Sequence, residues 1–233
     1  MQSELSLLIL TAITISCIHT LSGPDHYLPF VALSRSRGWT KPRTIVWTVV
    51  CGIGHVGSSV LLGLIGIAVG FSLSKLSWFE GIRGGFAAWA LLIFGLLYTI
   101  WGLWQVKLNR THKHFDIYDD GSIYVFEHQH NGAVGAKNRY PVTPWVMFFI
   151  FAMGPSEPMI PLLSYPAAQH SLLGITSLIL AYIFFSVSTM VLMVILGLYG
   201  IEFFKIGKAE RYVHALGGLT ILICGIGMVF MGW

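Results

Sequence analysis

Four polar residues, three of them histidines, interrupt two otherwise apolar stretches near the start of the chain. They are His19, Asp25, His26 and His55. Neutral imidazole and carboxylate groups are ligands that suit divalent transition-metal ions. Ionisable side chains inside a lipid bilayer are costly, so they usually serve a function such as ion transport. These residue types therefore predict a metal site, and we expect neither an enzyme nor a protein with a prosthetic group.

The spacing of the histidines brings them to a similar depth. His19 and His26 are seven residues apart, so a continuous helix would place both on one face. A Gly23-Pro24 pair between them predicts a break that tilts the following half-helix inward. His55 lies about 17 Å along the next apolar stretch, near mid-depth like His19. Ser59, one turn after His55, either bonds back to its own helix or joins the ligands.

The sequence around these residues has the composition of a membrane protein. Of its 233 residues, 55% are hydrophobic and only 10% are charged, whereas soluble domains contain about 25% charged residues. A helix needs about 20 apolar residues to cross a bilayer. The chain has six such stretches, at 5–33, 44–72, 84–106, 144–166, 172–198 and 212–232. We therefore predict an all-α polytopic protein with six transmembrane helices, surrounded by lipid and without a nucleic-acid partner.

Lysine and arginine residues are distributed unequally among the predicted loops. Of the 14 in the chain, the second and fourth loops contain only Lys75 and Arg83, and the rest lie in the first, third and fifth loops. Basic loops remain in the cytoplasm. We therefore expect a multi-pass protein of the bacterial plasma (inner) membrane with both termini outside.

The first and fourth apolar stretches carry matching breaks. Gly23-Pro24-Asp25-His26 aligns with Gly154-Pro155-Ser156-Glu157. Three helices per half is an odd number, so the halves would have opposite orientations, as in transporters built from inverted repeats with a central site at broken helices. Glu157, the counterpart of His26, joins the candidate site as a compensating charge or proton acceptor. The predicted units are a first three-helix repeat at 1–106, a cytoplasmic loop at 107–143 and a second repeat at 144–233.

The motifs resemble those of the nickel/cobalt permease superfamily, which includes UreH-like permeases and cobalt/nickel efflux permeases. The segment from His19 to His26 is similar to the His-x4-Asp-His signature, and Gly54-His55-Val-Gly-Ser58-Ser59-Val is similar to the Gly-His-Ser-Thr-Val-Val motif. One extra residue separates His19 from Asp25 here. The resemblance covers residues 15–65 well and the rest by layout. It implies Ni²⁺ or Co²⁺ as the substrate, ligand roles for His19, Asp25, His26 and His55, and a cytoplasmic metallochaperone or urease-type accessory proteins as partners.

Two other functions remain as alternatives. Pro24 and Pro155 fit the first position of new half-helices. Two half-helix N-termini aimed at a cavity favour an anion, so an exporter of a sulfite-like anion is the first. The second, a thiol–disulfide electron carrier, follows from a more distant likeness to LysE-type and DsbD/CcdA-like membrane proteins. Such reductases need a cysteine near the break in each half, and Cys17 has no counterpart near Pro155.

The 107–143 loop is polar and contains histidines 112, 114, 128 and 130. An Asp-Gly pair flanked by β-forming residues predicts a β-hairpin. A three-residue turn would place His112 opposite His128 and all four histidines on one face, whereas a two-residue turn would place the pairs on opposite faces. The loop either captures or senses cytoplasmic metal or is an ordinary solvated hairpin.

Elsewhere, Gly66-x-x-x-Gly70 predicts a packing seam within one chain or in a homo-oligomer.

Overall fold

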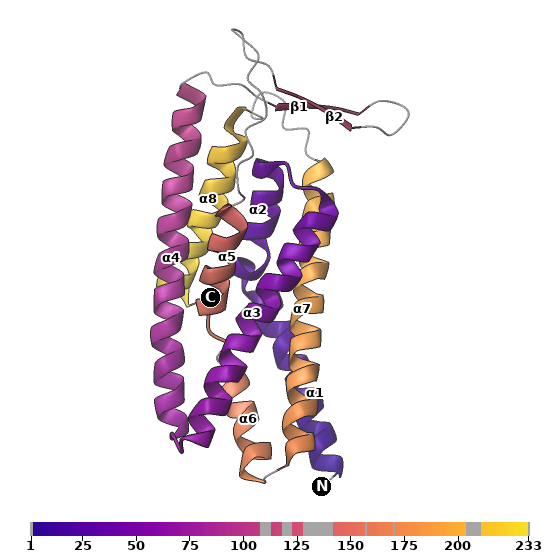
Figure 1. Ribbon diagram of the computed structural model, residues 1–233, viewed down its shortest axis with the longest axis vertical. Helices are drawn as coiled ribbons and strands as arrows, with labels where there is room; N and C mark the ends of the chain where they lie inside the picture. The colour runs from indigo at the N-terminus through magenta and orange to yellow at the C-terminus, as the bar shows by residue number, and fades with distance from the viewer. Residues whose placement is uncertain are drawn as a thin grey trace.

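The apolar stretches of the sequence fold into helices that run along one long axis, with a β-hairpin at one end (Figure 1). The computed structural model describes residues 2–107, 113–117, 123–127, 142–156, 158–169, 171–203 and 211–232. Its elements are α1 (Gln2–Ser22), η1 (Pro24–His26), α2 (Leu28–Arg37), α3 (Lys41–Ala68), α4 (Leu73–Lys107), β1 (Lys113–Ile117), β2 (Ile123–Glu127), α5 (Val142–Met153), α6 (Met159–Ala168), α7 (Leu172–Phe203), α8 (Val213–Ile226) and η3 (Gly227–Met231).

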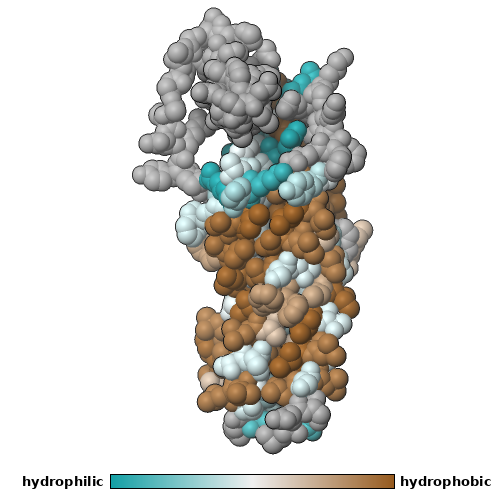
Figure 2. Space-filling model, turned by 90° about the vertical axis from the view of Figure 1, so that its right-hand side faces the viewer, coloured by the Kyte–Doolittle hydropathy of each residue, from teal (hydrophilic) through white to brown (hydrophobic). Residues whose placement is uncertain are grey.

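Among the described residues, five helical segments are long and apolar enough to cross a membrane, against the six predicted, because the stretch at 144–166 is divided between the shorter helices α5 and α6. The five segments are formed by α1, α3, α4, α7 and α8 continued by η3. Large hydrophobic side chains such as Leu7, Phe86 and Leu180 are exposed on them, and Figure 2 shows an apolar surface along the flank with hydrophilic residues toward the hairpin end. The chain is therefore predominantly helical and has the features of a multi-pass membrane protein.

Both predicted helix breaks are present. After Ser22 the chain forms the single 3-10 turn η1 before α2 begins, and residues 154–158 separate α5 from α6. Figure 1 shows α1 and α6 in the half of the bundle away from the hairpin and α2 and α5 in the other half. The expectation that Pro155 opens a new half-helix was wrong, because α6 begins four residues later at Met159.

The helix α4 corrects the predicted boundary of the third span. It begins at Leu73 instead of residue 84, so Lys75 and Arg83 belong to a helix and not to a loop. Three charged residues in this segment, Lys75, Glu80 and Arg83, suggested a loop. Glu80 and Arg83 are three residues apart, however, and form an ion pair within the bundle. The turn before α4 is short and closes at Gly70, whose φ of 77° is the left-handed conformation that glycine adopts without strain.

Small residues bring α4 and α8 into close contact. A Cβ atom on Gly95 would fall on the backbone of Leu222, and one on Gly225 would lie 2.5 Å from the backbone of Leu92. Glycine at such positions lets two membrane helices approach closely. Gly66, part of the predicted seam, packs within the chain, since its Cβ would collide with the Leu76 side chain.

Two apolar clusters lie on opposite sides of the level of the breaks. The hairpin-side cluster includes Phe30, Leu33, Leu91 and Phe151. The far-side cluster includes Ala12, Val60, Leu163, Leu178 and Tyr182. The breaks therefore lie in a polar layer between two packed cores.

The hairpin has the register of the three-residue-turn alternative. β1 and β2 are antiparallel, with Lys113 opposite Glu127 and Ile117 opposite Ile123. His112, His128 and His130 lie outside the described residues, and the side chain of His114 is not described. The hypothesis that these histidines bind metal stays a prediction.

The α4–α8 contact predicts unequal effects of two alanine substitutions in α4. Gly95→Ala should lower the free energy of unfolding by about 1–3 kcal/mol, because the new methyl group would overpack the backbone contact. Gly85→Ala is the control, since its Cβ would meet nothing within 4 Å, and it should leave stability unchanged or slightly higher. Denaturant unfolding in detergent would measure both, and equal stabilities would contradict the packing described.

Candidate metal centre

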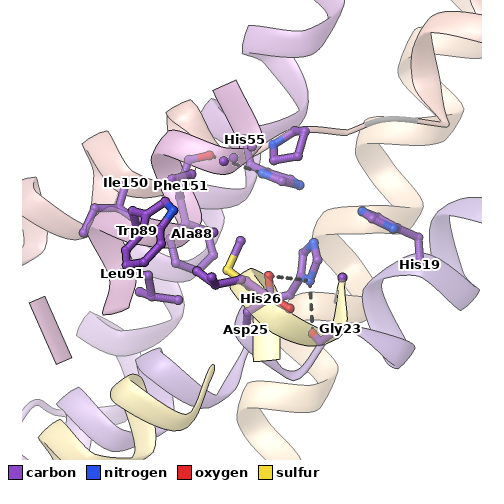
Figure 3. A pocket seen from close by; sticks show the side chains of 18 of the residues that line it. His19, Gly23, Asp25, His26, His55, Ala88, Trp89, Leu91, Ile150 and Phe151 are labelled. Atoms are coloured by element: carbon purple, nitrogen blue, oxygen red, sulfur yellow. Dashed lines mark hydrogen bonds and ion pairs between the residues drawn. The ribbon is translucent and has the colours of Figure 1, made fainter. Parts of the chain in front are cut away.

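Three histidines from separate segments meet at the first break. His19 lies in the last turn of α1, His26 ends η1, and His55 lies in the middle of α3. Ring centroids are 4.9 Å apart for His19 and His26 and 5.1 Å apart for His26 and His55. One ligand atom from each side chain lies within 4.8 Å of those of the other two. Figure 3 shows the three rings around a common space.

The hydrogen bonds of two of these rings determine which nitrogen is available. His26 Nδ1 lies 3.0 Å from the carbonyl oxygen of Gly23, and His55 Nδ1 lies 3.2 Å from that of Phe151. A carbonyl only accepts, so each Nδ1 donates its proton. Nε2 of His19, His26 and His55 is buried without a hydrogen-bond partner among the described residues. An imidazole held through Nδ1 in this way presents an Nε2 lone pair, as in metal sites.

Each break places a glycine against one of these imidazoles. A Cβ atom on Gly23 would lie 2.5 Å from His26 Nδ1, and one on Gly154 would lie 3.0 Å from His55 Nδ1. Gly23 also supplies the carbonyl that His26 uses, because the 3-10 turn after Pro24 points this ring back toward it. The Gly-Pro pairs identified in the sequence thus provide space and acceptors for the rings.

Asp25 lies beside the imidazole group and not within it. Its Oδ2 is 3.4 Å from His26 Nδ1, the side of the ring that also faces Gly23. The three histidines form the group of closely spaced potential ligands without this carboxylate, although its other oxygen, Oδ1, is also buried without a hydrogen-bond partner among the described residues. Asp25 therefore acts on the nitrogen opposite the free Nε2, where a carboxylate orients a ligand ring and makes it more basic.

A cavity of about 470 Å³ adjoins the imidazoles. The three histidines and Asp25 line one side, and glycines of α4 line another. Five lining residues are exposed, Ser22, Gly81, Gly85, Trp89 and Gly232, so the cavity opens beside α4, near the end of α1 and the residues after η3. Gly81 and Gly85 lie in the first half of α4, and this helix begins at the end of the bundle away from the hairpin (Figure 1).

The donor set fits a transition-metal ion of intermediate softness. Imidazole nitrogens bind Zn²⁺ at about 2.0–2.1 Å and suit Cu, Fe and Ni as well. Two nitrogens on one ion are then about 3–4 Å apart, so the rings need only small side-chain rotations to close on an ion. Open cavity space beside them leaves room for water ligands.

The remaining predicted ligands are placed differently. Ser59 Oγ donates to Glu80 Oε2 at 3.2 Å and accepts from Arg83 at 2.8 Å and from the Ser156 backbone N–H at 3.0 Å. This hydroxyl therefore belongs to a polar network one turn beyond His55. Glu157 lies outside the described residues.

Glu80 and Arg83 were missed by the sequence reasoning. Glu80 is fully buried and Arg83 is 14% exposed at its side chain. The sequence contains a signal for this ion pair, because opposite charges three residues apart on a helix commonly pair. Small residues, Gly84 and Gly85, follow Arg83 directly.

The three cysteines are free thiols. Cys51 and Cys224 are buried, and Cys17 is half-buried and accepts a hydrogen bond from Thr189 at 3.5 Å.

The hydrogen bonds to Gly23 and Phe151 predict the tautomers of two neutral rings. Histidine-labelled protein should show, by nitrogen NMR, protonated Nδ1 and unprotonated Nε2 for His26 and His55, because each Nδ1 faces a carbonyl oxygen. Loss of the respective signals in His26→Ala and His55→Ala would assign them. Rings protonated at Nε2 would contradict the arrangement.

Comparisons with protein-family models, curated proteins and solved structures found no match for the chain. The geometry of the three imidazoles is therefore the basis for inferring function.

Proposed function

We propose that this protein transports a divalent transition-metal ion across a membrane. The observation that carries the proposal is the convergence of three imidazoles from α1, η1 and α3 beside a cavity, with unpartnered Nε2 atoms on all three. Buried polar atoms normally have a hydrogen-bond partner, and exceptions require an explanation. A bound cation would explain why the Nε2 atoms of all three histidines lack a hydrogen-bond partner.

The fold supports a topology of six passes in two inverted repeats. In this topology α1–η1–α2 and α5–α6 are each one pass, and α3, α4, α7 and α8 are the other four. The two halves then repeat the order of a broken pass followed by two long helices, and α1 and α5 run in opposite directions (Figure 1). Contacts between the halves are reciprocal, since α3 packs on α5 and α6 while α7 packs on α1 and α2.

Nickel and cobalt are the proposed substrates. Imidazole ligands suit both ions, and the motifs around His26 and His55 resemble those of nickel/cobalt permeases. Basic residues lie near the hairpin end, including Arg35, Arg37, Lys41 and Arg43. In the proposed orientation this end faces the cytoplasm of a bacterium and the N-terminus faces outside. The ligand set serves import and export equally.

The mechanism follows from the cavity and the two clusters. A hydrated ion enters beside Gly81 and Gly85 and exchanges water for the Nε2 atoms of His19, His26 and His55. Asp25 compensates part of its charge through His26. The hairpin-side cluster around Phe30 and Phe151, whose rings are 4.8 Å apart, closes the opposite route. Rocking of one repeat against the other would open this route and close the first.

A cation is favoured over an anion by the donor atoms themselves. The Nε2 lone pairs are acceptors and repel an anion unless the rings gain protons.

The proposed transport predicts loss of activity when either of two imidazoles is removed. His26→Ala and His55→Ala should each abolish nickel- or cobalt-dependent uptake or resistance, because a two-imidazole site coordinates the ion too weakly. Cellular metal content and growth in the presence of metal would measure this, with membrane fractions confirming that the variants are present. His214→Ala is the matched control, since this histidine lies in α8 near Tyr98 and does not line the cavity. Full activity in both site variants would refute the site.

A second prediction concerns the glycine beside His26. Gly23→Ala should weaken metal binding by about 10- to 100-fold, as loss of an outer partner does, because the new methyl group would displace the His26 ring and Asp25. Gly57→Ala in α3 should bind normally, since its Cβ would meet nothing within 4 Å. Calorimetric titration with Ni²⁺ would compare the two variants, and equal affinities would count against the described position of His26.

A further inference from the structure

An arginine inside α4 connects three elements at the second break. The guanidinium Nη2 of Arg83 lies 2.8 Å from the carbonyl oxygen of Gly154, 2.8 Å from Ser59 Oγ and 3.2 Å from Ser58 Oγ. Its Nε lies 3.3 Å from the carbonyl oxygen of Met153. One side chain therefore holds the end of α5 against α3.

Glu80 keeps this guanidinium in place. Its Oε1 lies 3.1 Å from Arg83 Nη1, and its Oε2 accepts from Ser59 at 3.2 Å. A buried ion pair contributes little net stability, because the desolvation cost of two charges cancels most of their attraction. The Glu80–Arg83 pair instead fixes the orientation of the planar guanidinium, which donates hydrogen bonds in several directions at once.

The carbonyls that Arg83 binds belong to the helix end that orients His55. The last carbonyl groups of a helix lack partners within it and carry partial negative charge, which suits a cationic donor. Phe151, whose carbonyl accepts from His55 Nδ1, lies in this same last turn of α5. The hydroxyl of Ser58 also donates to the carbonyl oxygen of His55 at 2.8 Å. Arg83 is thus bonded to the end of the helix that carries the acceptor Phe151 and to Ser58, whose hydroxyl is bonded to His55.

Gly154 contacts both Arg83 and His55. Its carbonyl oxygen accepts from Arg83, and its α-carbon lies so close to His55 that a Cβ would be 3.0 Å from Nδ1. Without the guanidinium, the carbonyls of Met153 and Gly154 would have to find other donors within an apolar environment. The end of α5 would then shift, and the Phe151 carbonyl would shift with it.

We propose that Arg83, held by Glu80, is a positioning residue for the metal site that keeps His55 Nε2 directed at the ion by fixing the C-terminal end of α5. This inference rests on the proposed function. Arg83 does not touch the ion. The pair with Glu80 also leaves no uncompensated positive charge beside a site for a cation.

The test is a Co²⁺ titration of the purified full-length protein, with X-ray absorption counting the imidazole ligands per bound ion. Wild-type protein should bind Co²⁺ through three imidazoles. Arg83→Gln should bind about 10- to 100-fold more weakly and with two imidazoles, because His55 no longer faces the ion. Arg83→Lys keeps the charge but not the planar set of donors, so it should bind with intermediate affinity.

Lys75→Gln is the matched control, because it removes an exposed cation from the same helix, and it should behave as the wild type does. A lower bound fraction with three imidazoles per ion in Arg83→Gln would mean a merely structural role and would overturn the proposal. So would wild-type affinity in either Arg83 variant, and Arg83→Lys carries the test if Arg83→Gln does not fold. Absence of imidazole-bound Co²⁺ in the wild type would instead refute the proposed function on which the inference rests.

Discussion

The structure depends on how two interrupted helices satisfy their backbone groups inside an apolar bundle. A helix break frees carbonyl and N–H groups that lipid cannot hydrogen-bond, and each unsatisfied group costs several kcal/mol. Here side chains supply the partners: His26 of the same turn donates to Gly23, and from other helices His55 donates to Phe151 and Arg83 donates to Met153 and Gly154. The same bonds that make the breaks tolerable also orient the rings. The hydrogen bonds that stabilise the breaks are therefore the same ones that form the site.

This coupling explains why the site lies between two packed clusters. The clusters on the two sides of the breaks are apolar and close-packed, so the half-helices α1, α2, α5 and α6 are held by their outer parts. Their inner ends therefore lie at the level of the two breaks, between the clusters. A cavity in that layer is acceptable because its walls carry polar groups. In the proposed transporter, movement of one repeat against the other would open the hairpin-side cluster, which contains residues of both repeats such as Phe30 and Phe151.

Much of this arrangement could be predicted from the sequence, but by different signals. Apolar length predicted the helices, and the two Gly-Pro pairs predicted the breaks, since both signals are local. The spacing of His19, His26 and His55 predicted a common depth, although the direction of each ring depends on carbonyls that the sequence does not place. Asp25 could not be assigned to the outer side of His26, because the 3-10 turn of η1 changes its direction from that of an α-helix. Glu80 and Arg83 were read as loop residues because charge in an apolar region resembles a boundary until its partner is known.

The placement of charge is also suited to transport as opposed to tight storage. A transported ion must bind well enough to lose water and weakly enough to leave. Three neutral imidazoles supply coordination without adding negative charge, and Asp25, the carboxylate that lies beside them among the described residues, contacts His26 Nδ1. The attraction of Asp25 for the cation therefore acts across the His26 ring and is weaker than that of a carboxylate in direct contact with the ion. The Glu80–Arg83 pair adds no net charge to this layer. A cavity with two carboxylates directly on the ion would hold it more tightly and release it more slowly, which is the opposite of what alternating access requires.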